Sequence, residues 1–164
     1  MAYQKLQVGL GIKVIPSDTI NIPNVSGPTE SSTTTATTSN KLTDGAASFT
    51  NNLVGYIVYN TTDNTVATVT AVDSGTELSL SADIMANGED YTLYADDNAG
   101  CVLYVGNAAA DADTFNVSVV TSSGSELTFS GLQSGSFIPV QVKQVKATGT
   151  GANGTGVLEL VALW

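Results

Sequence analysis

The sequence contains no histidine and no arginine, and its five basic residues are all lysines. Without imidazole the chain lacks the commonest general base of enzymes, and without guanidinium it lacks a bidentate clamp for phosphate or carboxylate. Catalytic triads that depend on histidine are therefore excluded. No glycine-rich motif for phosphate or dinucleotide binding is present. We expect a protein that is not an enzyme and binds no cofactor.

Carboxylates are the remaining side chains that could support catalysis. A pair of them can in principle hydrolyse a glycosidic bond. Most acidic residues here stand beside Gly, Asn or Ser, where they are typical of solvated turns, and nothing in the sequence selects a pair.

Cysteine is also scarce. Cys101 is the only one, so the chain cannot form an internal disulfide, and its fold does not depend on an oxidising compartment. We expect Cys101 to serve as a small apolar residue in a strand from Cys101 to Val105.

Positive charge is scarce as well, with fifteen acidic residues against five lysines and a formal charge of −10. No basic stripe is available to bind nucleic acid or an anionic membrane, so neither is expected as a partner. The first ten residues lack the pattern of a signal peptide, and no stretch is long and apolar enough to span a membrane. We therefore expect synthesis and folding in a cytoplasm.

The patterns that are present are those of strands. Apolar and polar residues alternate with a period of two from Val66 to Val72, and helix-period patterns are nearly absent. Residues 55–82 predict three short strands, with turns near Asp63-Asn64 and Asp73-Ser74-Gly75. The sequence thus indicates an all-β protein.

Two breaks divide the chain. Nine of the eleven residues from Thr29 to Ser39 are Ser or Thr, so we expect an exposed connector at 31–39. A second break falls at Asp96–Gly100. Between them, residues 40–96 are strongly acidic and predict a small antiparallel β-barrel. Residues 1–30 and 97–164 would then form one discontinuous host domain, either a β-sandwich or jelly-roll-like.

The host segments contain several features of strands and turns. Pro139 predicts the start or edge of a strand from Val140 to Val145, with Val142 and Val145 on opposite faces. Gly106, Gly131 and Gly135 are expected where turns, bulges or close backbone approach require glycine. Residues 157–164 predict a final strand that ends in the only tryptophan, Trp164.

Four segments carry a resemblance to a known family. They are "VIPSDTINIP" (Val14–Pro23), "LYVGNA" (Leu103–Ala108), "ELTFSGLQSGSFIPVQVKQVKATGTG" (Glu126–Gly151) and "VALW" (Val161–Trp164). In this order they resemble the head-spike base proteins of tailed phages and gene-transfer particles. The acidic block is similar to a β-barrel module that recurs in structural proteins of marine phages, and the glycine-rich stretch 149–156 is longer than the usual turn of the family.

The resemblance implies a virion structural protein on the outside of a phage head, made in the host cytoplasm. It implies a symmetric homo-oligomer, trimer or pentamer, that contacts the major capsid protein, with a fibre protein as a further candidate partner. Two roles stay open: a spike or fibre base at head vertices, and a cement or decoration protein over the capsid lattice. A third role is binding of host-surface carbohydrate through exposed rings among Tyr56, Tyr59, Tyr91 and Tyr94.

Candidate contact and metal residues complete the expectations. The apolar termini and one strand edge are expected at interfaces between subunits; these residues are Tyr3, Leu6, Val8, Ile12, Val14, Pro139, Val161, Leu163 and Trp164. Trp164 could equally belong to an ordinary core. Calcium is a weaker expectation at acidic turns, with candidates Asp96, Asp97, Asp111 and Asp113.

Overall fold

The computed structural model describes residues 9–27, 29–107 and 114–164. These residues form an all-β protein with two antiparallel sheets, one of them curled into a half-barrel, which confirms the fold class. The chain divides into two compact units. The first unit comprises Met1–Ile22 and Asn98–Trp164, and the second comprises Pro23–Asp97. The expected interface residues Tyr3, Leu6 and Val8 and the calcium candidates Asp111 and Asp113 lie outside the described residues.

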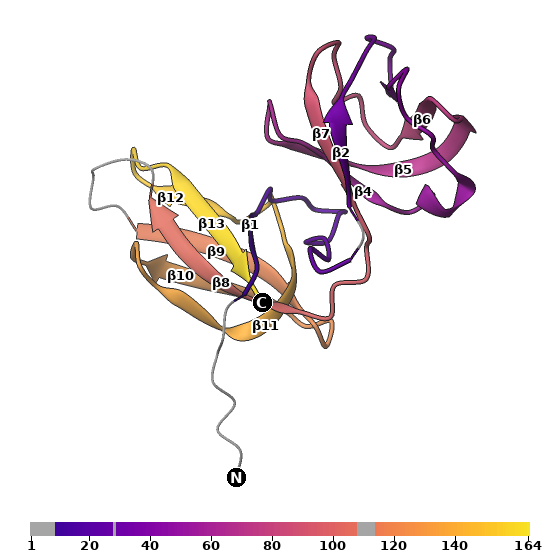
Figure 1. Cartoon of the computed structure of the whole chain (residues 1–164). Coiled ribbons are helices and arrows are strands. Elements are labelled where there is room, and N and C mark those ends of the chain that lie inside the picture. The colour runs from indigo at the N-terminus through magenta and orange to yellow at the C-terminus, as the bar shows by residue number, and fades with distance from the viewer. Residues whose placement is uncertain (1–8, 28, 108–113) are drawn as a thin grey trace. The chain divides into compact units, whose positions relative to one another are not determined.

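The sheet of the first unit has the strand order β1-β13-β8-β11-β9-β10, with β12 paired to β9 (Figure 1). Its strands are β1 (Gly11–Lys13), β8 (Cys101–Asn107), β9 (Thr114–Thr121), β10 (Glu126–Leu132), β11 (Phe137–Val145), β12 (Gly151–Asn153) and β13 (Leu158–Leu163). Strands from both ends of the described chain therefore meet, because Gly11 on β1 pairs with Leu163 on β13.

The core of this unit lies on one face of the sheet. Alternate residues of β8, β9 and β13 point to it, as the period of two requires. Leu103, Val105, Phe115, Val117 and Leu160 are among the side chains that are fully or almost fully buried there.

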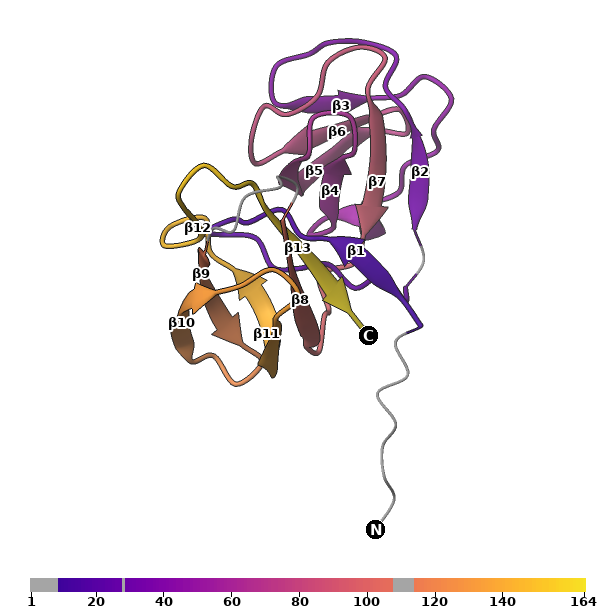
Figure 2. The same ribbon diagram turned by 90° about the vertical axis from the view of Figure 1, so that its left-hand side faces the viewer.

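The second unit contains the sheet β2-β7-β4-β5-β6-β3 (Figure 2). Its elements are β2 (Glu30–Thr33), β3 (Lys41–Thr43), the 3-10 turn η1 (Asn51–Leu53), β4 (Ile57–Asn60), β5 (Thr65–Ser74), β6 (Glu77–Leu80) and β7 (Asp90–Tyr94). β4, β5 and β6 confirm the three strands predicted for residues 55–82. Asn64, with a φ of 55°, turns the chain between the first two.

This unit has a separate core, built around Leu42, Val58, Val69, Leu78 and Leu93. Its two ends lie side by side, because Asn24 N–H donates to the Ala95 carbonyl at 3.0 Å and Asn24 Nδ2 donates to Asp97 Oδ1 at 2.8 Å. The unit therefore begins at Pro23, earlier than the expected boundaries at 30 and 40.

The Ser/Thr-rich stretch is exposed as expected, except at Thr34 and Ala36, but it is part of this sheet and not a connector. Residues 30–33 form β2 and pair with β7. The next residues join the far edge of the sheet, since Thr35 N–H donates to the Thr43 carbonyl on β3. Thr34 is buried, and its hydroxyl donates to the carbonyls of Ala86 and Glu89. Threonine is β-branched, and its hydroxyl can form hydrogen bonds with backbone groups. It therefore suits a strand that has no apolar anchor.

Two expectations about β11 also change. The strand begins at Phe137, so Pro139 lies inside it. The pairing with β8 is irregular between Ile138 and Val142, and Pro139 is not paired with a residue of β8 there. A second irregularity follows between Val142 and Gln144. An extra residue reverses the alternation. Val142 and Val145 consequently both point into the core, although the sequence pattern placed them on opposite faces.

Candidate functional site

The outward face of the first sheet carries an apolar surface. Val102, Tyr104 and Phe137 alternate with core residues on β8 and β11, and Val161 and Leu163 do so on β13. The strand registers place these five side chains together, because Leu163 is opposite Val102, while Val161 and Phe137 flank Tyr104 on either side. We call Val102, Tyr104, Phe137, Val161 and Leu163 the outer apolar face.

Two aromatic rings, one of them the most exposed side chain of this face, contact each other. The ring centroids of Tyr104 and Phe137 are 5.4 Å apart with an interplanar angle of 63°, an edge-to-face contact. Phe137 is 54% exposed, and the other four members are partly exposed. Gly106 allows a close approach here, since a Cβ would lie 3.3 Å from the Glu159 carbonyl oxygen and 3.5 Å from Cε1 of Tyr104. This close approach is the role expected for Gly106.

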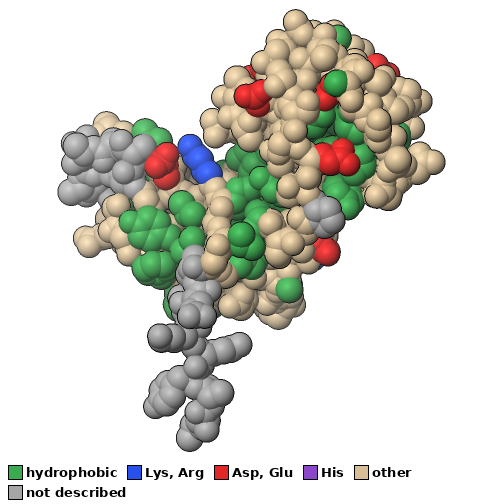
Figure 3. All heavy atoms as spheres, in the orientation of Figure 1, with side chains coloured by type: hydrophobic (Ala, Val, Ile, Leu, Met, Phe, Trp, Pro, Cys, Tyr) green, Lys and Arg blue, Asp and Glu red, His purple; other side chains and the backbone are tan. Residues whose placement is uncertain are grey.

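One ion pair borders the outer apolar face. Lys13 Nζ on β1 lies 3.3 Å from Glu159 Oε1 on β13, and both side chains are about half exposed, at 54% and 43%. Figure 3 shows hydrophobic side chains gathered on the visible side of this unit, next to a lysine and a carboxylate. The surface thus combines an apolar centre with one charge of each sign.

The structure places the expected interface residues in different settings. Val161 and Leu163 belong to the outer apolar face, and Pro139 is exposed on β11. Val14 is buried in the core, and Ile12 packs against that core. Trp164 also packs against the core, and its Nε1–H donates to Asn98 Oδ1 at 3.1 Å.

Three residues of the outer apolar face were missed from the sequence: Val102, Tyr104 and Phe137. Alternation shows that a strand has two faces, but both faces of β8 are apolar in sequence, so the exposed one could not be selected.

Charge is distributed unequally between the two units. The second unit contains ten of the fifteen acidic residues and one lysine, a side-chain charge of −9. The first unit contains five acidic residues and four lysines, a charge of −1. The lysine of the second unit, Lys41, is itself 2.8 Å from Asp73 and 3.7 Å from Glu77. The second unit therefore presents an acidic surface, whereas the first is almost neutral.

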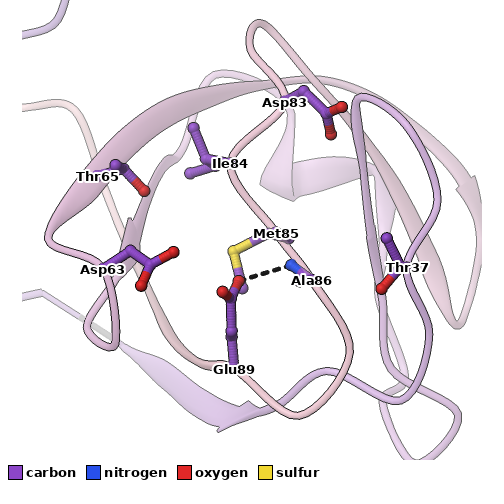
Figure 4. A pocket seen from close by; sticks show the side chains of 8 residues that line it. All are labelled: Thr37, Asp63, Thr65, Asp83, Ile84, Met85, Ala86 and Glu89. Carbon is purple, nitrogen blue, oxygen red and sulfur yellow. Dashed lines mark hydrogen bonds between the residues drawn. The ribbon is translucent and has the colours of Figure 1, made fainter.

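The second unit also has an open hollow of about 330 Å³ beside β5 and the loop before β7 (Figure 4). Figure 4 shows the carboxyl groups of Asp63 and Glu89 pointing into it, with Asp83 apart from this pair. Glu89 Oε2 accepts hydrogen bonds from Ala86 N–H at 2.6 Å and from Asn60 Nδ2 at 2.8 Å. The hydrogen bond with Glu89, and then its negative charge, raise the pKa of Asp63.

These carboxylates do not make a metal centre. Among the residues that the structure describes, no three His, Cys, Asp or Glu side chains are arranged to hold a metal ion. Asp96 and Asp97 are exposed, and Oδ1 of Asp97 accepts a hydrogen bond from the side-chain amide of Asn24. The other two calcium candidates, Asp111 and Asp113, lie outside the described residues.

The four tyrosines of the second unit do not form an exposed groove. Tyr59 and Tyr91 are buried, while Tyr56 and Tyr94 are partly buried. Tyr59 and Tyr94 make an edge-to-face contact at 5.5 Å. The carbohydrate-binding alternative predicts exposed rings in a groove, whereas two of these rings are buried and two are only partly exposed.

Cys101 lies in β8 as expected and is 1% exposed. Its thiol donates to the Val142 carbonyl at 3.3 Å. Burial raises the pKa of Cys101 to about 12, despite a hydrogen bond with Asn98 that acts in the opposite direction. The thiol is therefore protonated and shielded, which suits a core residue and not a nucleophile.

Two of the segments that carry the family resemblance touch one another. The carboxylate of Asp18, in the Pro-Ser-Asp segment, accepts hydrogen bonds from the backbone N–H of Thr148 at 3.0 Å and from its hydroxyl at 2.9 Å. These bonds, the backbone bond first, lower the pKa of Asp18. Both segments thus serve to hold the first unit together.

In the part of the chain that the structure describes, no helix is long and apolar enough to cross a membrane. Comparison with known proteins yields no match, whether against family models, curated proteins or solved structures.

Proposed function

We propose that this chain is a non-enzymatic structural protein of the exterior of a tailed-phage head, where it acts as the base for a spike or fibre at the head vertices. The resemblance of the segments Val14–Pro23, Leu103–Ala108, Glu126–Gly151 and Val161–Trp164 to head-spike base proteins supports the location. The described site residues support a binding role, because the thiol of Cys101 is buried and the carboxylates lie in turns or accept hydrogen bonds.

The observation that carries the proposal is the contrast between the two units. The first unit is nearly neutral and exposes an apolar sheet face, which suits contacts with other proteins. The second unit carries a charge of −9, which suits exposure to water and repels similar acidic surfaces. A protein of a particle surface needs both properties, one for attachment and one for keeping particles apart.

The test is the copy number of this chain relative to the major capsid subunit in purified particles, measured by quantitative peptide mass spectrometry. A few copies per vertex would support the spike or fibre base. Copies comparable to the capsid subunit would instead assign a cement or decoration role on the lattice. Absence of the chain from particles would overturn the proposal of a virion structural protein.

A further inference from the structure

We propose that the outer apolar face of the first unit binds the same face of a second copy of this chain. The inference rests on the proposed function of a particle-surface protein, for which the family resemblance implies a homo-oligomer, and it identifies the surface that joins the copies. It is carried by the juxtaposition of the Tyr104–Phe137 aromatic contact on this face with the Lys13–Glu159 ion pair at its border.

The apolar part of the surface favours a protein partner. Three neighbouring strands, β13, β8 and β11, contribute its five side chains, so the surface is continuous across the sheet. The aromatic pair provides large, rigid contact area, and aromatic residues are enriched at the centres of protein interfaces. Because the opposite side of these strands is already the core of the unit, a partner on the outward side would leave the sheet covered on both faces.

The charges identify that partner as a second copy. The border of the face carries one positive and one negative side chain 3.3 Å apart, so this border adds no net charge that would repel an identical face. The first unit has a charge of −1, and two such units approach with little repulsion. A basic partner would be expected to dock on the second unit, where the charge is −9.

A face that pairs with itself joins copies in twos. This differs from the trimer or pentamer that the family resemblance implied, and the molar mass in solution distinguishes them. Sedimentation equilibrium of the full chain over a range of concentrations should give a dimer. A monomer at every concentration, or a ring of three or five, would overturn the inference.

A matched pair of charge variants tests the surface. Phe137→Asp places a carboxylate at a 54% exposed position on the face and should convert the dimer to a monomer. Val54→Asp makes the same kind of change at a 51% exposed valine of the second unit and should leave the dimer intact. Equal dissociation of both variants, or of neither, would contradict the assignment of this face.

A second pair of variants does not depend on losing the dimer. Cys101 is buried, so the thiol added by Phe137→Cys is the one that a reagent can reach. Val54→Cys adds an exposed thiol to the second unit and is the control. A short bis-maleimide should join two copies of Phe137→Cys and far fewer of Val54→Cys. Equal crosslinking of the two would overturn the inference even if Phe137→Asp failed to fold.

The two proposals can fail separately. A dimer held by this face, with no chain found in particles, would refute the virion role and keep the interface. A chain present in particles whose purified form is monomeric would refute the interface and keep the virion role.

Discussion

The hydroxyl of Tyr91 donates a hydrogen bond to Oδ2 of Asp44 over 2.9 Å, and both side chains are buried in the second unit. The pair joins β7 to the turn that follows β3, which are far apart in the sequence. Ala46 N–H donates to the other carboxylate oxygen at 2.9 Å. A buried carboxylate in an acidic unit is thus kept in place by neutral donors.

Removing the hydroxyl of Tyr91 should destabilise the second unit. Tyr91→Phe keeps the ring but leaves Asp44 without one donor, and a hydrogen bond to a charged group contributes about 1.5–3 kcal/mol. The free energy of unfolding from urea titration should fall by about that amount. Tyr56→Phe, at a half-buried ring beside the same core, is the control and should change stability little. A comparable loss in the control would refute the role of the Asp44 contact.

Acid should weaken the second unit through Asp44. Burial alone would raise the pKa of this carboxyl, but hydrogen bonds from Ser32, Ala46, Tyr91 and Ala47 together lower it below 3.8. A group with a lowered pKa in the folded state stabilises above its unfolded value, and this contribution is lost as pH falls through the folded value. Stability should therefore decline below about pH 4. Asp44→Asn should be less stable at neutral pH and lose part of this slope; an unchanged slope would contradict the assignment.

Cys101 should not react with thiol reagents in the folded protein. Its thiol is 1% exposed and its pKa is raised to about 12, so little thiolate exists at neutral pH. Ellman's reagent should modify it only after denaturation, at the rate of unfolding. Phe137→Cys supplies a positive control that reacts at once at its added thiol. Rapid labelling of the unmodified protein would show that the core around β8 opens readily.

Gly131 should be intolerant of a side chain for reasons of backbone strain alone. Its φ is +71°, and a Cβ there would meet no atom within 4 Å. Gly131→Ala should lower the free energy of unfolding by about 1–2 kcal/mol, the cost of the left-handed conformation. Gly151→Ala, also without a neighbour within 4 Å and without a positive φ, should cost less. Equal losses would exclude strain as the cause.

Residues 23–97 should fold without the rest of the chain. The buried residues of the two cores do not overlap, and the ends of this segment are bridged at Asn24 and Ala95. A segment of this size can sustain its own core. Expressed alone, it should give one cooperative urea transition with the Asp44–Tyr91 contact intact, as shown by sensitivity to Tyr91→Phe. A gradual transition would mean that its stability depends on the first unit.

The strands from Ile57 to Leu80 were predictable because local preference and tertiary pairing agree there, with Asn64 well suited to its turn. The stretch 31–39 was not, because Thr33 and Thr34 are fixed by hydrogen bonds to residues more than fifty positions away, which leave no local pattern. Alternation gave the wrong face for Val145, because an extra residue in β11 turns every following side chain to the opposite face of the sheet. For the candidate surface, the sequence indicated Val161 and Leu163 but not Tyr104 or Phe137, because exposure depends on which face of the sheet is covered.

The pairing of Gly11 with Leu163 has a consequence for the order of events during synthesis. All strands of the second unit lie between Glu30 and Tyr94, so this sheet can form while β13 has still to be translated. β1 must wait for β13, across almost the whole chain, and such distant pairing is slow. Once Asn24 and Ala95 are bridged, the intervening residues count as a short loop and the entropic cost of bringing β1 to β13 falls. In the nascent chain, the folded acidic unit would then keep the segment before Asn24 close to the segment that follows Ala95.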